Sequence, residues 1–245
     1  NYAKDDAGGA SNCQVFDSVV TRNRSSNIGG GLSGTAFRDC LAYNCTVVSN
    51  ISTAGAIVGS DLRNCLVTGN LTANGIPDDF RENDDSKNIL SSCWTNLVSF
   101  VDAANGDFRF SGLIDDEVDA HPCVNAGDNG AVVSEMDLDG NVRIFDSVVD
   151  IGAYEFRGCI YKLKNYAGAY DGNGHSIQVT PCWPTGATVS YSLTREGPYA
   201  TEPILMTNVC EPTKIWFTVV AEGHETVTNF GTVVISGIDL SAVTV

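Results

Sequence analysis

The sequence is poor in positive charge. It contains 14 Lys and Arg residues against 30 Asp and Glu, which gives a formal net charge of −16. Proteins that bind nucleic acid neutralise phosphates with clustered basic side chains, so this balance argues against a nucleic-acid partner. No apolar run reaches the length of a membrane span, and we therefore expect no membrane insertion.

Motifs that bind metals are also missing. The three histidines (His121, His175 and His224) are far apart, and the nine cysteines form no Cys-x-x-Cys pair. These absences exclude zinc-ribbon and thioredoxin-like sites. The cysteines are then either disulfide partners in a secreted protein or buried thiols in a core. We expect no cofactor, with calcium left open.

The sequence does contain a repeat. "NCQVFDSVVTRN" (Asn12–Asn23) aligns without a gap with "DCLAYNCTVVSN" (Asp39–Asn50), and "NCLVTGN" (Asn64–Asn70) aligns with "NCTVVSN" (Asn44–Asn50). Periods of roughly 20–30 residues indicate a solenoid. Apolar residues are spaced as in strands and Gly runs interrupt the segments, which excludes helical repeats. The repeat predicts a parallel β-helix with one coil per phrase.

Such stacking predicts ladders of like residues. Equivalent positions in adjacent coils lie about 4.8 Å apart. Cys45 and Cys65 should therefore be neighbouring rungs of one ladder that continues Ser18, and Cys13 and Cys40 should form a second ladder. We interpret these thiols as small core residues, and we expect Asn or Asp at the corners to adopt left-handed backbone geometry. The anchoring Asn of the phrase recurs at Asn23, Asn50 and Asn70.

The repeat is no longer recognisable between Ala73 and Ser92. This segment is acidic and apolar residues are few, so we predict a solvated surface loop rather than a calcium site. Its acidic residues are Asp78, Asp79, Glu82, Asp84 and Asp85.

Four later phrases carry a resemblance: "NGDFRF" (Asn105–Phe110), "PCVNAGDN" (Pro122–Asn129), "DLDGNVR" (Asp137–Arg143) and "VDIGAYEF" (Val149–Phe156). Together with the preceding coils, they resemble the end of bacterial secreted right-handed β-helix proteins, the pectin-lyase-like surface proteins with a variable C-terminal anchor. The resemblance implies a domain of coils and closing segment over residues 1–158 and an extracellular location, secreted or at the cell surface. It implies no particular reaction.

Relatives of this fold include polysaccharide lyases and glycoside hydrolases. A lyase needs a basic residue beside acidic ones, and a hydrolase needs paired carboxylates. We interpret the charged residues of these coils as charges that stack from rung to rung. About three coils are also too few for a long substrate groove, so we predict that the chain has no enzymatic activity. Asp137 and Asp139 remain weak calcium candidates. The coil residues considered for catalysis are Arg22, Arg24, Arg38, Arg63, Asp17, Asp39 and Asp61.

After Cys159 the pattern changes to alternating strands separated by turns. Alternation is clear over residues 176–179, 187–192 and 214–219, which predicts a small antiparallel β-sandwich over residues 159–236. "YDG" (Tyr170–Gly172), "GATVSYS" (Gly186–Ser192) and "VVAEGH" (Val219–His224) resemble the immunoglobulin-like repeats of bacterial surface proteins. Residues 237–245 would form a linker or a spare strand.

Three side-chain roles are predicted in this second domain. A Cys182–Cys210 disulfide is the leading pairing, and closing a loop of this length contributes about 3 kcal/mol in the chain-entropy model. Trp183 and Tyr199 are candidates for stacking on glycans, whereas Trp216 should belong to the core.

The functional prediction is a non-catalytic structural or adhesive module of a bacterial surface protein or of a self-assembling extracellular fibre. Its partners would be further copies of the chain or neighbouring domains. The alternatives are a carbohydrate-binding adhesin and, with less support, a fragment of a polysaccharide lyase or glycoside hydrolase.

Overall fold

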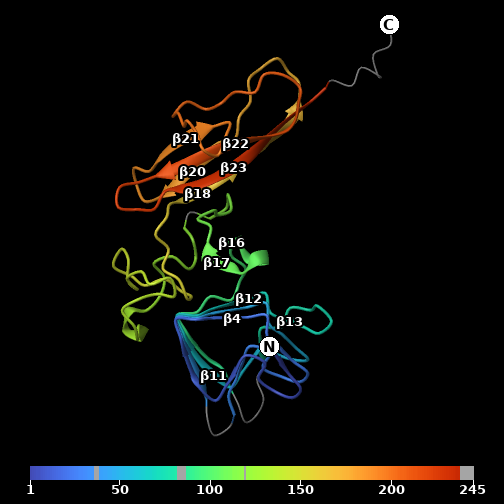
Figure 1. The fold of residues 1–245 in the computed structure, drawn as a ribbon, viewed down its shortest axis with the longest axis vertical. Coiled ribbons are helices and arrows are strands. Elements are labelled where there is room, and N and C mark those ends of the chain that lie inside the picture. Colours follow the sequence, from blue (N-terminus) through green and yellow to red (C-terminus); the bar gives the residue numbers. More distant parts are fainter. Residues whose placement is uncertain (36–38, 82–86, 119, 238–245) are drawn as a thin grey trace. The chain divides into compact units, whose positions relative to one another are not determined.

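The computed structural model describes residues 1–35, 39–81, 87–118 and 120–237 (Figure 1). The chain divides into two compact units. Unit 1 comprises residues 1–110 and 122–156, and unit 2 comprises residues 111–121 and the chain from Arg157 onward. The predicted linker at 238–245 lies outside the described residues. Within the described ranges, no helix is long and apolar enough to cross a membrane.

Unit 1 is built from four parallel sheets whose strands come from successive turns of the chain. This arrangement is compatible with a β-helix-like fold. The first sheet contains β1 (Tyr2–Ala3), β5 (Arg24–Ser25), β9 (Ile51–Ser52) and β13 (Leu71–Thr72), and the second contains β2 (Ala10–Ser11), β6 (Leu32–Ser33), β10 (Ile57–Val58) and β14 (Phe80–Arg81). The third sheet contains β3 (Gln14–Phe16), β7 (Cys40–Tyr43), β11 (Ser60–Arg63) and β15 (Ile89–Ser91). The fourth contains β4 (Val19–Thr21), β8 (Thr46–Val48) and β12 (Leu66–Thr68).

The register of these sheets follows the sequence repeat. Val19 pairs with Thr46, and Thr46 pairs with Leu66, so aligned residues of the phrases stack in space. Small and branched apolar side chains from the coils point inward and share one core. Its fully buried members are Leu32, Cys40, Ala42, Cys45, Val47, Ile57, Leu62, Cys65 and Val67.

The acidic segment after Ala73 does not form the continuous loop that was predicted. β14 pairs with β10 and β15 pairs with β11, both in parallel, so the coils continue through this region. Asp79 is half-buried, and its carboxylate accepts hydrogen bonds from the backbone and side-chain amides of Asn70. The acidic composition hid a further rung, in which the Asp79 carboxylate is the acceptor at the end of the row of repeated Asn residues. Glu82, Asp84 and Asp85 lie outside the described residues.

The remainder of unit 1 is an antiparallel hairpin and a segment of turns. The hairpin pairs β16 (Phe100–Asp102) with β17 (Asp107–Phe110) around the 3-10 turn η1 (Ala103–Asn105). Residues 122–156, called here the closing segment, contain only the short 3-10 turn η2 (Asn129–Ala131). Isolated hydrogen bonds, rather than a strand ladder, must therefore hold the closing segment on the coils.

Unit 2 consists of two sheets around a second core. Residues 111–121 join it because the backbone amide of Ile114 donates to the carbonyl of Tyr161. In one sheet, β18 pairs with β20 in antiparallel orientation. In the other sheet, β22 pairs with β21 and β23 in antiparallel orientation, and β19 pairs with β23 in parallel. The strands are β18 (Ile160–Lys164), β19 (Tyr166–Ala169), β20 (Gln178–Trp183), β21 (Thr188–Ser192), β22 (Cys210–Val220) and β23 (Val227–Ser236).

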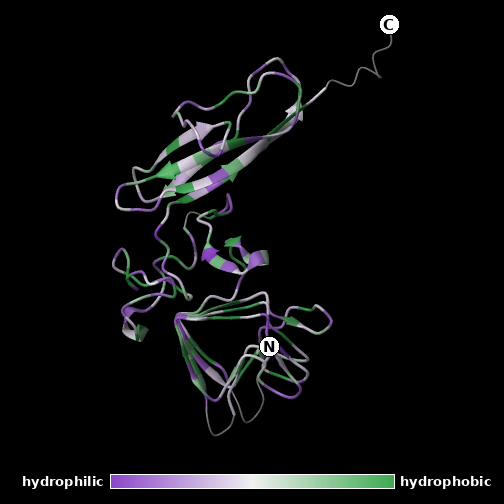
Figure 2. Ribbon diagram, viewed as in Figure 1, coloured by the Kyte–Doolittle hydropathy of each residue, from purple (hydrophilic) through white to green (hydrophobic). Residues whose placement is uncertain are grey.

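Hydrophobic and hydrophilic residues alternate along the long strands of unit 2 (Figure 2). On β22, Ile215, Phe217 and Val219 are buried in the core of this unit. Trp216 lies between them on the opposite face and is only half-buried. The prediction that Trp216 belongs to the core was therefore wrong, because strand alternation turns its ring away from the buried row.

Candidate functional site

A column of corner residues runs along the coils of unit 1. Asp17, Asn44 and Asn64 have φ values of 43°, 51° and 50°. This left-handed geometry is the one expected for Asn and Asp at the corners, because their short side chains bond locally. We call these three residues the corner column.

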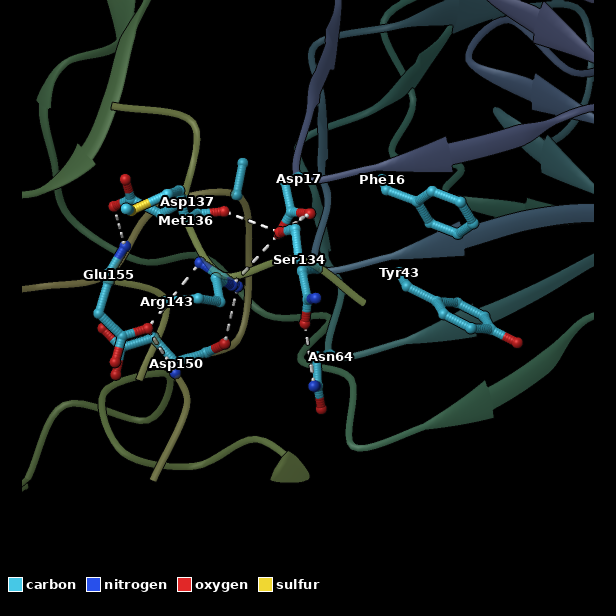
Figure 3. Close-up of polar contacts among 12 residues, drawn as sticks. Phe16, Asp17, Tyr43, Asn64, Ser134, Met136, Asp137, Arg143, Asp150 and Glu155 are labelled. Atoms are coloured by element: carbon cyan, nitrogen blue, oxygen red, sulfur yellow. Dashed lines mark hydrogen bonds and ion pairs between the residues drawn. The ribbon is translucent and has the colours of Figure 1, made fainter. Parts of the chain in front are cut away.

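Arg143 of the closing segment lies beside the corner column (Figure 3). Its side chain is only 1% exposed, with Nε 3.3 Å from Asp17 Oδ1 and Nη1 3.8 Å from Glu155 Oε2. Nη2 donates to the carbonyls of Gly152 at 2.5 Å and Asp150 at 3.3 Å. Asp17 Oδ2 also accepts a 2.6 Å hydrogen bond from Ser134 Oγ. One guanidinium therefore joins the first coil to two parts of the closing segment. We call Asp17, Arg143, Asp150 and Glu155 the charge network.

Backbone amides satisfy the buried acids of this network. Asp150 accepts hydrogen bonds of 2.6 Å from the amides of Asn125 and Phe156. Glu155 accepts from the amides of Phe145 at 2.8 Å and Asp150 at 3.1 Å. Each carboxylate thus joins two backbone segments that are not paired in a β-sheet.

Burial dominates the electrostatics of the charge network. Burial raises the pKa of Asp150 to about 7, against the opposing effect of its two amide donors and Arg143. Burial, followed by repulsion from Asp150, raises the pKa of Glu155 to about 8. Asp150 and Glu155 share one guanidinium in this desolvated place, and burial therefore disfavours the charged forms of these two carboxyls.

Further polar bonds fix the closing segment along the corner column. Asn64 Oδ1 accepts from the amide of Asp128 at 2.7 Å, and Asn64 Nδ2 donates to the Asp128 carbonyl at 2.9 Å. The amide of Ala153 donates to Thr46 Oγ1, and that of Gly152 donates to the Asn64 carbonyl. Contacts from three successive coils therefore meet one face of the segment.

The carboxylates of the two calcium candidates, Asp137 and Asp139, have different partners. Asp137 Oδ1 accepts from the amides of Asp139 and Asn141, and Oδ2 accepts from the amide of Glu155. The Asp139 carboxylate instead lies 3.8 Å from the guanidinium of Arg109. The oxygens that would bind a cation at Asp137 face N–H donors, and no metal-binding group of three ligands occurs in the described part of the chain.

The predicted cysteine positions lie on successive rungs. The amide of Thr46 donates to the Ser18 carbonyl and that of Leu66 donates to the Cys45 carbonyl, which stacks Ser18, Cys45 and Cys65. Cys93 adds a rung that the sequence analysis did not assign, since the amide of Trp94 donates to the Cys65 carbonyl. The second ladder places Cys13 beside Cys40, where the amide of Leu41 donates to the Cys13 carbonyl.

The repeated Asn residues form a hydrogen-bonded column inside the coils. Asn23 Nδ2 donates to Asn50 Oδ1 at 3.1 Å, and Asn50 Nδ2 donates to Asn70 Oδ1 at 2.9 Å. Asn70 Nδ2 then donates to Asp79 Oδ1 at 2.7 Å. This column explains why the phrase keeps Asn at these positions: one side chain both accepts from one rung and donates to the next.

The Cys182–Cys210 disulfide is not present, and both residues are free thiols. Cys182 lies on β20, which pairs with β18, whereas Cys210 begins β22, which pairs with β21 and β23. The two strands belong to different sheets, so strand pairing does not bring the two thiols side by side.

The glycan-stacking candidates are both half-buried. Trp183 packs edge-on against His224 with ring centroids 4.7 Å apart, and Tyr199 donates its hydroxyl to the Arg195 carbonyl. A second aromatic group lies elsewhere: Trp216 and Phe230 are 5.1 Å apart, with Arg195 over the first ring and Lys214 over the second. Trp183 and Tyr199 therefore have different partners.

The coil residues considered for catalysis are dispersed. Asp61 and Arg63 form an exposed ion pair on β11 at 3.1 Å, and Arg22 donates to the carbonyls of Ala103 and Ala104. Asp17 belongs to the charge network, and Arg38 lies outside the described residues. Sequence reasoning missed the pairing of Asp17 with Arg143, because no local pattern links two residues so far apart in the chain.

Comparison with known proteins gave no relative. No protein-family model, curated protein or solved structure matches this chain. The resemblances described above therefore rest on the quoted phrases alone.

Proposed function

We propose that this chain is a structural or adhesive extracellular module of bacterial origin, made of a right-handed β-helix followed by an immunoglobulin-like sandwich. The observation that carries the proposal is the charge network. Arg143 is buried and ties the closing segment to the coils, and its acidic partners are engaged with backbone amides. Charged groups used in this way support a stiff scaffold.

The Asn column supports the same function. A column of side-chain amides that spans successive coils resists separation of the rungs, because each broken bond leaves a buried polar group unsatisfied. Further copies of the chain or neighbouring domains would be its partners. Such a module would act as a rigid spacer within a surface protein or a fibre.

Single-molecule pulling of the whole chain between its two termini tests this proposal. Unit 1 should unfold in one large, high-force event, and Arg143→Met should lower that force. Gradual unravelling of the coils at low force, unchanged in the variant, would remove the case for a rigid spacer. Sedimentation velocity of the same protein then reports whether it self-associates.

A carbohydrate-binding adhesin is the second candidate. Trp216 and Phe230 occupy the outer face of a sheet beside two cationic side chains, and half-buried rings in such a setting can stack on sugars. A glycan array probed with the whole chain tests this reading. Binding lost in Trp216→Ala but kept in Trp183→Ala would assign it to the outer face, the reverse pattern would assign it to Trp183, and absence of binding would reject it.

A further inference from the structure

The cysteine ladder repeats one local hydrogen bond on every rung. Ser18 Oγ donates to the Phe16 carbonyl, and Cys45 Sγ donates to that of Tyr43. Cys65 Sγ and Cys93 Sγ do the same toward the carbonyls of Arg63 and Ser91. The four side chains therefore project in the same way from stacked corners, which brings neighbouring thiols together.

Cys93 differs from the other two thiols in its surroundings. Cys45 and Cys65 are completely buried, whereas Cys93 is partly exposed on the outermost rung. The backbone amide of Cys65 donates to Cys93 Sγ at 3.4 Å. Its hydrogen bond with the Cys65 thiol lowers the pKa of Cys93, whereas burial raises the pKa of Cys65. Solvent access and a stabilised thiolate are the two conditions for thiol reactivity.

We propose that Cys93 is a thiol modification site that reacts with small-molecule disulfides and passes the disulfide bond on to Cys65. Adjacent rungs of a parallel coil are about 4.8 Å apart, inside the Cα–Cα range of about 4.4–6.8 Å for disulfides. The backbone amide of Cys65 donates to Cys93 Sγ, so the residue that carries the resolving thiol is already in contact with Cys93.

The exchange proceeds in two balanced steps. The Cys93 thiolate attacks one sulfur of glutathione disulfide, forming a mixed disulfide and releasing one glutathione thiolate. The Cys65 thiol gives its proton to that thiolate and attacks Cys93 Sγ, which releases the second glutathione. Two protein thiols are oxidised to one disulfide while glutathione disulfide is reduced to two glutathione molecules.

The test treats the native, full-length chain with glutathione disulfide, blocks the remaining thiols with N-ethylmaleimide and digests it with trypsin. Cleavage after Arg63, Arg81, Lys87 and Arg109 places Cys65 in peptide 64–81 and Cys93 in peptide 88–109. Cys45 falls in a separate peptide that ends at Arg63. We expect a loss of two hydrogens and a link between peptides 64–81 and 88–109.

Serine variants separate the roles of the thiols. Serine suits these positions because Ser18 already occupies the same ladder. Cys65→Ser should stop at a glutathionyl group on peptide 88–109, Cys93→Ser should abolish both products, and Cys45→Ser should react like the natural protein. Circular dichroism of each variant before oxidation checks that it is folded.

Three results would overturn the proposal: an unmodified peptide 88–109 in the native protein, a link from Cys65 to Cys45 instead, or reaction of Cys93 only after unfolding in urea. A stable glutathionyl group on Cys93 of the natural protein would reject the transfer to Cys65.

Discussion

At the scale of single residues, the molecule depends on buried polar side chains with several partners each. Asn50 is fully buried; its amide group donates to the carbonyls of Val20 and Val48 and to Asn70, and its Oδ1 accepts from Asn23. Both halves of the amide are therefore needed. The sequence repeat showed that an amide side chain recurs at this position. Only the stacked coils showed that this side chain both donates to one rung and accepts from another.

Replacing Asn50 with Asp tests this double role. The carboxylate can still accept from Asn23 but cannot donate to Val20 or Asn70, and a lone buried acceptor costs about 1–3 kcal/mol or more when charged. We expect the unfolding free energy, measured in urea, to fall by at least about 2 kcal/mol. The matched control Asn96→Asp is at an exposed position and should change it by less than about 0.5 kcal/mol. Equal effects would contradict the column.

Replacing Arg143 with Met tests the charge network. The variant keeps much of the side-chain volume but removes the ion pair with Asp17 and the donor to the carbonyls of Gly152 and Asp150, and breaking a buried pair in this way typically costs about 3–5 kcal/mol. Urea unfolding of unit 1 provides the measurement. Arg109→Met is the control, since its ion pair with Asp107 is on the surface, where such pairs contribute about 0–1 kcal/mol. A loss of unfolding free energy smaller than that of the control would show that Arg143 does not hold the closing segment on the coils.

At the scale of elements, the closing segment is held by side chains that titrate. The pKa values of Asp150 and Glu155 are raised to about 7 and about 8. At any pH between the ordinary pKa of each carboxyl and its raised pKa, the folded protein therefore binds more protons than the unfolded chain. Stability from this source is complete below about pH 4 and is lost as the pH rises through 7 and 8.

We therefore expect the urea midpoint of unit 1 to decrease between pH 5 and pH 8.5, and unfolding near pH 6 to release protons. Potentiometric titration of folded and unfolded protein measures the release directly. Asp139→Asn, a change at a more exposed carboxyl, should leave both observations unchanged. A midpoint that rises over this range would mean that the amide donors outweigh burial.

At the scale of the whole molecule, each unit has its own core. Phe217 is fully buried in unit 2 and meets Tyr161 edge-on at 5.3 Å. Phe217→Ala should destabilise unit 2 by about 3–5 kcal/mol through cavity formation. Calorimetry should show one transition shifted by this variant and another shifted by Arg143→Met. A single transition that moves in both variants would contradict independent cores.

The sequence by itself determined which residues repeat and where the chain changes character. The phrase around Cys45 and Cys65 predicted stacked coils because like residues must align in a parallel ladder, and alternation predicted the strands of unit 2 because side chains alternate across a strand. Unit 1 ends at Phe156, and residues 111–121 belong to unit 2 although they lie within the predicted first domain. These features depend on local periodicity.

Only the tertiary structure decided the contacts between segments distant in the chain. Asp17 and Arg143 are 126 positions apart, and no local pattern links them. The rung at Asp79 escaped detection because this residue aligns with Ala56 rather than with the repeated Asn, and only the fold brings its carboxylate to Asn70. The sequence favoured a Cys182–Cys210 disulfide, but strand pairing places the two residues in different sheets. Pairing is set by the burial of whole faces, which spacing along one strand does not specify.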